Sequence, residues 1–214
     1  MYRDPEKTKL VELRLVELVL GVHNLSDLRN AVVVHARTII INQGLLHYVP
    51  VNDFALIEVQ EKIVMRRTVQ AVGIPHAYDA HILPPGSSFV VYAFDSRGVK
   101  QVIGGVKLKV FDSSKHMKCG MFYRPEYHIC AVESGKSGQL NKGISGAPVI
   151  GFIGNRAVLI AYVTSKTRLD YIILSNMVAY RVIAYAAAKQ LVQMPDGAMG
   201  KLRRNGSAYV LLSL

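Results

Sequence analysis

A serine between two glycines stands directly before an apolar segment in the second half of the chain. Residues 143–148 are Gly-Ile-Ser-Gly-Ala-Pro, and the apolar stretch 149–153 follows. Gly143 allows the sharp turn that lifts a nucleophile clear of the backbone. The backbone N–H groups of Gly143 and Ser145 can then converge on a developing oxyanion. The motif indicates acyl-transfer chemistry with Ser145 as the nucleophile, although a polar turn between two strands would have the same pattern.

A histidine and a carboxylate upstream of Ser145 could complete a catalytic triad, because serine is a weak nucleophile at neutral pH without a base. His47 follows a strand-like segment and is the candidate base. Asp79 lies 32 residues later (79 − 47) and 66 residues before Ser145 (145 − 79), and it is the candidate acid. Asp53 or Glu58 could take the place of Asp79. This order and spacing suit a protease in which the base and the acid come from the first of two β-barrels.

The segment after Ser145 predicts an antiparallel hairpin. Gly154 and Asn155 favour a tight turn between the apolar stretches 149–153 and 157–163. A nucleophile at a turn that leads into a hairpin is the arrangement of the C-terminal barrel in chymotrypsin-like proteases. An α/β-hydrolase would have a helix after its serine, and no helical periodicity follows Ser145.

Short β-branched and apolar segments between turn residues predict strands along most of the chain. We expect strands within 31–42, 54–59, 62–72, 89–94, 99–111, 127–132, 149–153, 157–163, 169–174 and 209–212. Residues 7–20 fit a helix or a strand, whereas 176–194 predict a C-terminal helix. The expected fold class is mostly β, with two antiparallel β-barrels of the six-stranded type and a C-terminal helix.

The strongest break in the chain is Pro-Pro-Gly-Ser-Ser at 84–88, and we place the domain boundary there. Residues 1–86 are then an N-terminal β-barrel that carries the candidate histidine and aspartate. Residues 87–214 are a C-terminal β-barrel that carries the nucleophile motif, the S1 pocket and the terminal helix.

The chain is strongly basic, with a formal net charge of +11 and a pI near 9.7. This balance favours an acidic partner such as RNA, and the alternative is an ordinary solvated surface. The candidate basic patches are Arg66–Arg67, Lys107 with Lys109, Lys115 with Lys118, Lys166 with Arg168, and Arg203–Arg204. No apolar run reaches the roughly 18 residues that predict a transmembrane segment.

The cysteine and histidine content predicts neither a disulfide framework nor a metal site. Cys119 and Cys130 are the only cysteines. They could pair across a hairpin, but we expect two free thiols in a reducing compartment. The histidines are scattered, no Cys-X-X-Cys pair is present, and no nucleotide-binding glycine motif is found, so we expect no metal and no cofactor.

Four segments in order resemble the picornavirus-like 3C proteases, especially the comovirus–secovirus branch. They are 36–41, 79–84, 143–148 and 159–163. The resemblance implies a two-barrel, chymotrypsin-fold endopeptidase that cleaves a viral polyprotein in the host-cell cytoplasm, at viral replication complexes.

The resemblance also assigns roles to single residues. Ser145 would attack, His47 would be the base and Asp79 would orient it. The N–H groups of Gly143 and Ser145 would form the oxyanion hole. The S1 pocket would be shaped by Tyr162, Thr164 and Leu140.

Several positions depart from the 3C pattern. Ser145 stands where the family has cysteine, and Gly44 falls on the family's histidine in an ungapped count, so that His47 requires a three-residue insertion. Tyr162 replaces the histidine of the specificity pocket, and 164–166 replace the glycines after it. The alternative function is therefore a pseudoprotease, retained as a basic platform that binds RNA or replication proteins.

Overall fold

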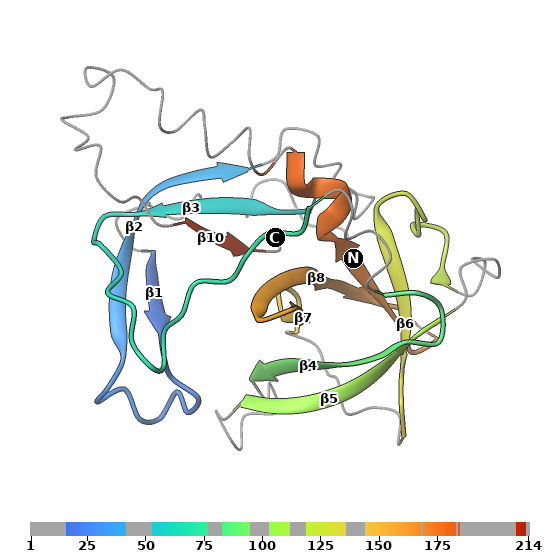
Figure 1. The fold of residues 1–214 in the computed structure, drawn as a ribbon, viewed down its shortest axis with the longest axis horizontal. Coiled ribbons are helices and arrows are strands. Elements are labelled where there is room, and N and C mark those ends of the chain that lie inside the picture. The colour runs from blue at the N-terminus through green and yellow to red at the C-terminus, as the bar shows by residue number, and fades with distance from the viewer. Residues whose placement is uncertain are drawn as a thin grey trace, which may run out of the picture.

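A four-stranded sheet and a closed six-stranded barrel lie beside each other, with a short helix at their junction (Figure 1). The computed structural model describes residues 16–41, 53–76, 83–94, 103–111, 119–135, 144–167, 169–182, 184 and 209–212. The sheet and the barrel confirm the expected mostly β class. One of the two expected barrels is closed, and within the described residues the other is a four-stranded sheet.

The first sheet brings together strands from both halves of the chain. In spatial order its strands are β1 (Glu17–Leu20), β2 (Val32–Ile41), β3 (Ala55–Val59) and β10 (Tyr209–Leu212), all antiparallel. Every residue of β3 is buried, which is typical of a strand covered on both faces.

The strands expected at 54–59 and 209–212 are confirmed, and the segment 31–42 resolves into one strand of ten residues. The expectation for 31–42 was a hairpin or two strands, and it is wrong. The strand is continuous, with a β-bulge at Arg37, between Ala36 and Thr38.

The prediction of strands within 62–72 is wrong. Only an isolated bridge between Arg66 and Val69 forms there, and the two backbones exchange hydrogen bonds of 2.9 and 3.1 Å across a tight turn. The neighbouring apolar residues Val64 and Met65 are 59% and 50% exposed. β-branched composition gave a wrong prediction here, because no strand in the described part of the chain pairs with the segment.

An ionic contact crosses the outer end of the first sheet at His35. The ring Nδ1 lies 2.6 Å from Glu61 and Nε2 lies 3.5 Å from Glu17, so one β2 side chain links β1 to the turn after β3. The hydrogen bond to Glu61, and with it the charges of both carboxylates, raises the pKa of His35.

We expect this contact to make stability fall as pH rises above neutrality. Because the folded pKa of His35 is raised, its contribution is complete below the unfolded value of about 6.5 and is lost as pH passes through the folded value. The free energy of unfolding, measured by urea denaturation between about pH 6 and 8, should therefore drop more for the wild type than for His35→Gln. An equal drop in His35→Gln would contradict the expectation.

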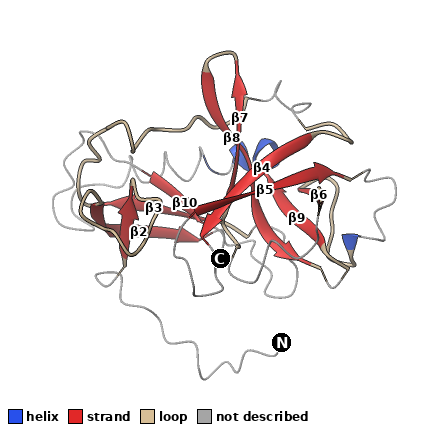
Figure 2. Ribbon diagram, turned by 90° about the horizontal axis from the view of Figure 1, so that it is seen from below, coloured by secondary structure: helices blue, strands red, loops and turns tan. Residues whose placement is uncertain are grey.

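The barrel is formed entirely from residues after the Pro84–Gly86 turn. Around the barrel the strands are β4 (Ser88–Phe94), β5 (Ile103–Val110), β6 (His128–Glu133), β9 (Tyr171–Asn176), β8 (Arg156–Lys166) and β7 (Pro148–Ile153). The expected hairpin after Ser145 is the β7–β8 pair, and it extends past the rest of the barrel (Figure 2). Phe152, near its tip, is accordingly 73% exposed.

Alternation along β5 separates the barrel core from a basic outer surface. Leu108 and Val110 are buried, while Lys107 and Lys109 are exposed. Neither lysine forms an ion pair with a described residue. Lys166 differs, because its Nζ lies 3.1 Å from both Glu133 and Asp170, so its charge is already balanced.

The expected domain boundary coincides with a turn that leads into β4. Ser87 N–H donates to the Pro84 carbonyl at 3.0 Å, and Gly86 has a φ of +88°. Residues 209–212 nevertheless pair with β3, so this last strand belongs to the first sheet rather than to the 87–214 barrel.

The expected C-terminal helix is present over 177–182 and at 184, and the rest of 176–194 lies outside the described residues. Asn176 caps it, since the side-chain Oδ1 accepts the N–H of Val178 at 3.0 Å. None of the helices in the described residues has the length and hydropathy needed to cross a membrane.

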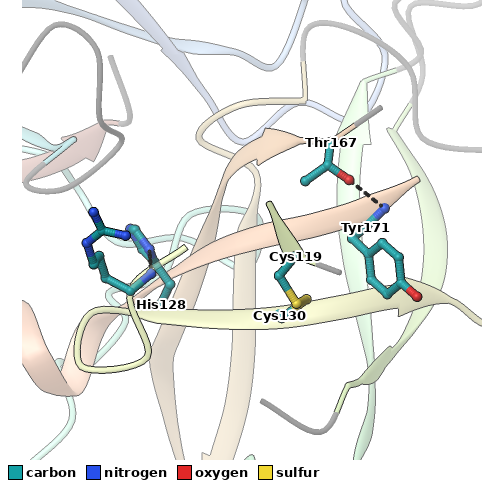
Figure 3. Close-up of a disulfide and its surroundings, with 6 residues drawn as sticks. Cys119, His128, Cys130, Thr167 and Tyr171 are labelled. Atoms are coloured by element: carbon teal, nitrogen blue, oxygen red, sulfur yellow. Dashed lines mark hydrogen bonds between the residues drawn. A yellow bond between two sulfur atoms is a disulfide. The ribbon is translucent and has the colours of Figure 1, made fainter. Parts of the chain in front are cut away.

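The prediction of two free thiols is wrong, because Cys119 and Cys130 form a disulfide (Figure 3). Only 11 residues separate them, and the intervening loop turns back so that both sulfurs meet in the core beside β6. Tyr123 and Ile173 pack on the bond, and both cysteines are at most 1% exposed. The prediction from cysteine content and compartment was wrong because cysteine content carries no information on how the loop brings the two residues together.

Candidate active site

Ser145 lies on a tight turn that is fixed to the barrel on both sides. Ala147 N–H donates to the Ile144 carbonyl at 2.9 Å, and Gly146 has a φ of +85° at the third position of the turn. That position of a type II turn strongly favours glycine. Ile144 and Ala147 are 6% and 8% exposed and belong to the barrel core, while Ser145 between them is exposed. The turn therefore presents a hydroxyl on a rigid base.

Strand β8 holds this turn through three hydrogen bonds. The Ser145 Oγ donates to the Thr164 carbonyl at 3.1 Å. The Gly146 N–H donates to Val163 O at 2.8 Å, and the Val163 N–H donates to Ala147 O at 2.9 Å. The pairing of β8 with β9 is interrupted between Val163 and Ser165, where Thr164 is the extra residue. Bulges of this kind commonly redirect backbone groups next to functional sites.

A second contact of β8 reaches the first sheet at Asp53. The Tyr162 hydroxyl donates to the Asp53 carbonyl at 2.9 Å, across 109 residues of sequence. Asp53 is 5% exposed and Tyr162 is 2% exposed, so both lie inside the junction. Burial raises the pKa of Tyr162 well above its usual value, and the negative charge of Asp53 adds to the shift. The backbone of Asp53 is therefore held against this strand of the barrel.

A buried pair of hydroxyls fixes β8 against β9. Thr164 Oγ1 and Ser175 Oγ lie 2.6 Å apart, and their side chains are 6% and 0% exposed. Sequence reasoning missed Ser175, although a single hydroxyl in the apolar strand Tyr-Ile-Ile-Leu-Ser-Asn was a signal. Thr164, predicted to shape the S1 pocket, therefore holds Ser145 through its carbonyl and the neighbouring strand through its side chain.

The predicted site residues are described only in part. Ser145, Thr164 and Tyr162 lie on the same side of the barrel and are connected through β8. The predicted base, acid, oxyanion-hole glycine and pocket leucine lie outside the described residues, and these are His47, Asp79, Gly143 and Leu140. Their roles, like the pocket role of Tyr162, stay predictions.

The structure distinguishes between the two alternative acids. Asp53 precedes β3 and contacts the barrel through Tyr162. Glu58 is 2% exposed and pairs in register with Thr38 and Tyr209, within the first sheet. Asp53 stands directly before a fully buried strand, whereas Glu58 lies within it.

Four histidines are described, and none of them hydrogen-bonds Ser145. His35 contacts two glutamates, His76 Nε2 lies 3.2 Å from Arg156, and His128 Nδ1 accepts the Arg124 N–H at 3.0 Å. His23 lies on the turn after β1. Within the described part of the chain, no three or more His, Cys, Asp or Glu side chains are placed to hold a metal ion.

The comparison with known protein families agrees with this geometry. Residues 10–165 match the family described as Trypsin, which is well over half of the 214 residues. The chain belongs to the trypsin family. Among solved structures, one titled "Structure of GrC" is 19% identical over 81% of this chain and 77% of that chain, with a TM-score of 0.69. No curated protein matches the chain.

Membership of the trypsin family refines the expectation drawn from the sequence. The chymotrypsin fold and a peptidase function in general were expected. The family supports both, and the solved structure supports the fold. The narrower resemblance to viral 3C proteases has no such support, since the matching family is the broad trypsin one.

Proposed function

We propose that this chain is a serine endopeptidase domain in which Ser145 attacks the peptide carbonyl. The observation that carries the proposal is the exposed Ser145 hydroxyl, which stands on a rigid turn fixed to β8. A nucleophile must be accessible and held in one geometry, because small displacements reduce the rate steeply.

Asp53 is the orienting carboxylate in this proposal, in place of the predicted Asp79. The acid of a catalytic triad is buried and holds the histidine in one tautomer and orientation. Asp53 has the required burial, at 5% exposure, and contacts the strand that holds Ser145. His47 is the base, six residues before Asp53 (53 − 47).

The proposed reaction follows from these positions. The Ser145 hydroxyl turns from the Thr164 carbonyl towards the base and transfers its proton as Oγ bonds to the peptide carbon. The N–H groups of Gly143 and Ser145 stabilise the oxyanion of the tetrahedral intermediate. The base then protonates the leaving amine, and water releases the acyl group from Ser145 by the reverse proton transfers.

The disulfide bears on where such an enzyme would act. Disulfides form and persist in oxidising compartments and are rare in the cytosol. The buried bond between Cys119 and Cys130 therefore favours a secreted or lumenal enzyme over one in the host-cell cytoplasm. Cleavage of a viral polyprotein stays a prediction of the sequence resemblance alone.

A second candidate function is a binding platform without catalysis. One observation favours it: the outer face of β5 carries Lys107 and Lys109 without an ion-pair partner among the described residues. Such a surface would attract an acidic partner, RNA included, with an affinity that falls steeply with salt.

Labelling with a fluorophosphonate, followed by intact mass and peptide mapping, tests the proposed function. The full chain should gain one adduct on Ser145, and Ser145→Ala and His47→Ala should gain none. Ser165→Ala, which changes a serine three residues from Tyr162 on the same strand, is the control and should label like the wild type. A folded chain that gains no adduct would overturn the peptidase in favour of the platform.

A further inference from the structure

The geometry points to Tyr162 as a positioning residue, which holds Asp53 of the first sheet at a fixed place relative to the turn that carries Ser145. The inference rests on the proposed function, because it takes Asp53 as the orienting carboxylate. Its starting point is the buried hydrogen bond of 2.9 Å from the Tyr162 hydroxyl to the Asp53 carbonyl.

A single strand connects the two halves of the site. Tyr162 and Thr164 lie two residues apart on β8. The first donates to Asp53, and the carbonyl of the second accepts the Ser145 hydroxyl at 3.1 Å. If Asp53 moved away from β8, the proposed acid would therefore also move away from Ser145.

Tyr162 lies in buried, apolar surroundings, which strengthen this hydrogen bond. Phe54, Met177 and Tyr180 belong to the same buried cluster, and the rings of Phe54 and Tyr180 lie 5.4 Å apart. Hydrogen bonds are electrostatically stronger in such an apolar environment than in water. Burial also raises the pKa of Tyr162, so the phenol remains a donor at any pH at which a peptidase would work.

The contact joins two separately formed sheets. Asp53 precedes β3, whose hydrogen-bonding partners β2 and β10 both lie in the first sheet. Backbone hydrogen bonds of Gly73 with Ala157 and Leu159 also join β8 to the first half of the chain. The Tyr162 hydroxyl differs from them because it reaches Asp53 itself.

Tyr162→Phe removes the hydroxyl and keeps the ring, and its matched control is Tyr171→Phe. Tyr171 lies on the neighbouring strand β9, packs on Phe111 at 5.1 Å, and makes no hydroxyl hydrogen bond to a described residue. We expect Tyr162→Phe to lower the fluorophosphonate inactivation rate at saturating probe about 10- to 100-fold, since a misplacement of about 1 Å has effects of this size. The apparent probe affinity should stay unchanged, and Tyr171→Phe should react like the wild type.

The pH dependence of the inactivation rate separates positioning from a general loss of structure. A displaced carboxylate stabilises the protonated base less, so the acidic limb of the profile should move to lower pH in Tyr162→Phe. A merely destabilised protein would react more slowly without moving that limb. A wild-type rate and profile in Tyr162→Phe would overturn the inference.

A spectroscopic readout tests the contact without relying on activity. Asp53–Phe54 is the only Asp-Phe pair in the chain, so labelling with ¹³C-carbonyl aspartate and ¹⁵N phenylalanine gives one HNCO cross-peak. Its carbonyl shift should move in Tyr162→Phe and stay in Tyr171→Phe. If the peak moves while the wild type gains no adduct, the contact stands and the proposed function fails. If the peak does not move, the positioning role itself is overturned.

Discussion

Asp53→Asn is expected to lower the rate of reaction at Ser145 about 10⁴-fold, the size of effect that follows when a triad carboxylate becomes an amide. The amide keeps the volume of Asp53 but cannot stabilise the charge that develops on the base, and it favours the wrong imidazole tautomer. The measurement is the pseudo-first-order rate of fluorophosphonate adduct formation by intact mass, at fixed probe concentration and pH.

Asp79→Asn is the matched comparison, because it changes the carboxylate that the sequence alone favoured. The structure places Asp53 beside the strand that holds Ser145, so we expect Asp79→Asn to react within a few-fold of the wild type. Both variants should retain the wild-type circular dichroism spectrum. A large loss in Asp79→Asn together with a normal rate in Asp53→Asn would return the role to Asp79.

Reduction of the Cys119–Cys130 disulfide is expected to lower the free energy of unfolding by about 3 kcal/mol, from the chain entropy of a loop of this length. The two cysteines are 11 residues apart and are buried with Tyr123 and Ile173, so the reduced thiols would keep their packing but lose the constraint on the unfolded chain. Urea denaturation with and without a reductant measures the difference.

The variant with both Cys119→Ala and Cys130→Ala provides the control for reductant effects elsewhere in the molecule. It should be less stable than the oxidised wild type and should show the same midpoint with and without reductant. An oxidised wild type whose midpoint is also insensitive to reductant would mean that the bond adds nothing measurable to stability.

The sequence predicted the elements that depend on local signals. The β7–β8 hairpin was expected because Gly154 and Asn155 mark its turn. The turn at Ser145 was expected from Gly143, and the structure has the positive φ at Gly146. β-branched composition predicted most strands correctly, but it failed at 62–72, which pairs with no strand among the described residues. Local pattern does not specify which strands will find partners.

The candidate site was less predictable because it depends on contacts between distant parts of the chain. Ser145 was found from its glycines, whereas the contact of Asp53 with Tyr162 joins residues 109 apart and has no signal in the sequence. The disulfide was missed for a related reason, since compartment statistics carry no information on how the loop before β6 returns. Residues that act through packing rather than through a motif need the fold before they can be assigned.

The pairing of β10 with β3 has a consequence for synthesis on the ribosome. Tyr209 pairs with Glu58, 151 residues earlier (209 − 58), so β3 emerges long before the strand that covers its edge. Until then the growing chain presents an apolar strand with unpaired N–H and C=O groups, which can pair with the same strand of another chain. Nascent chains that stall before residue 209 should therefore depend on chaperones more than the finished protein does.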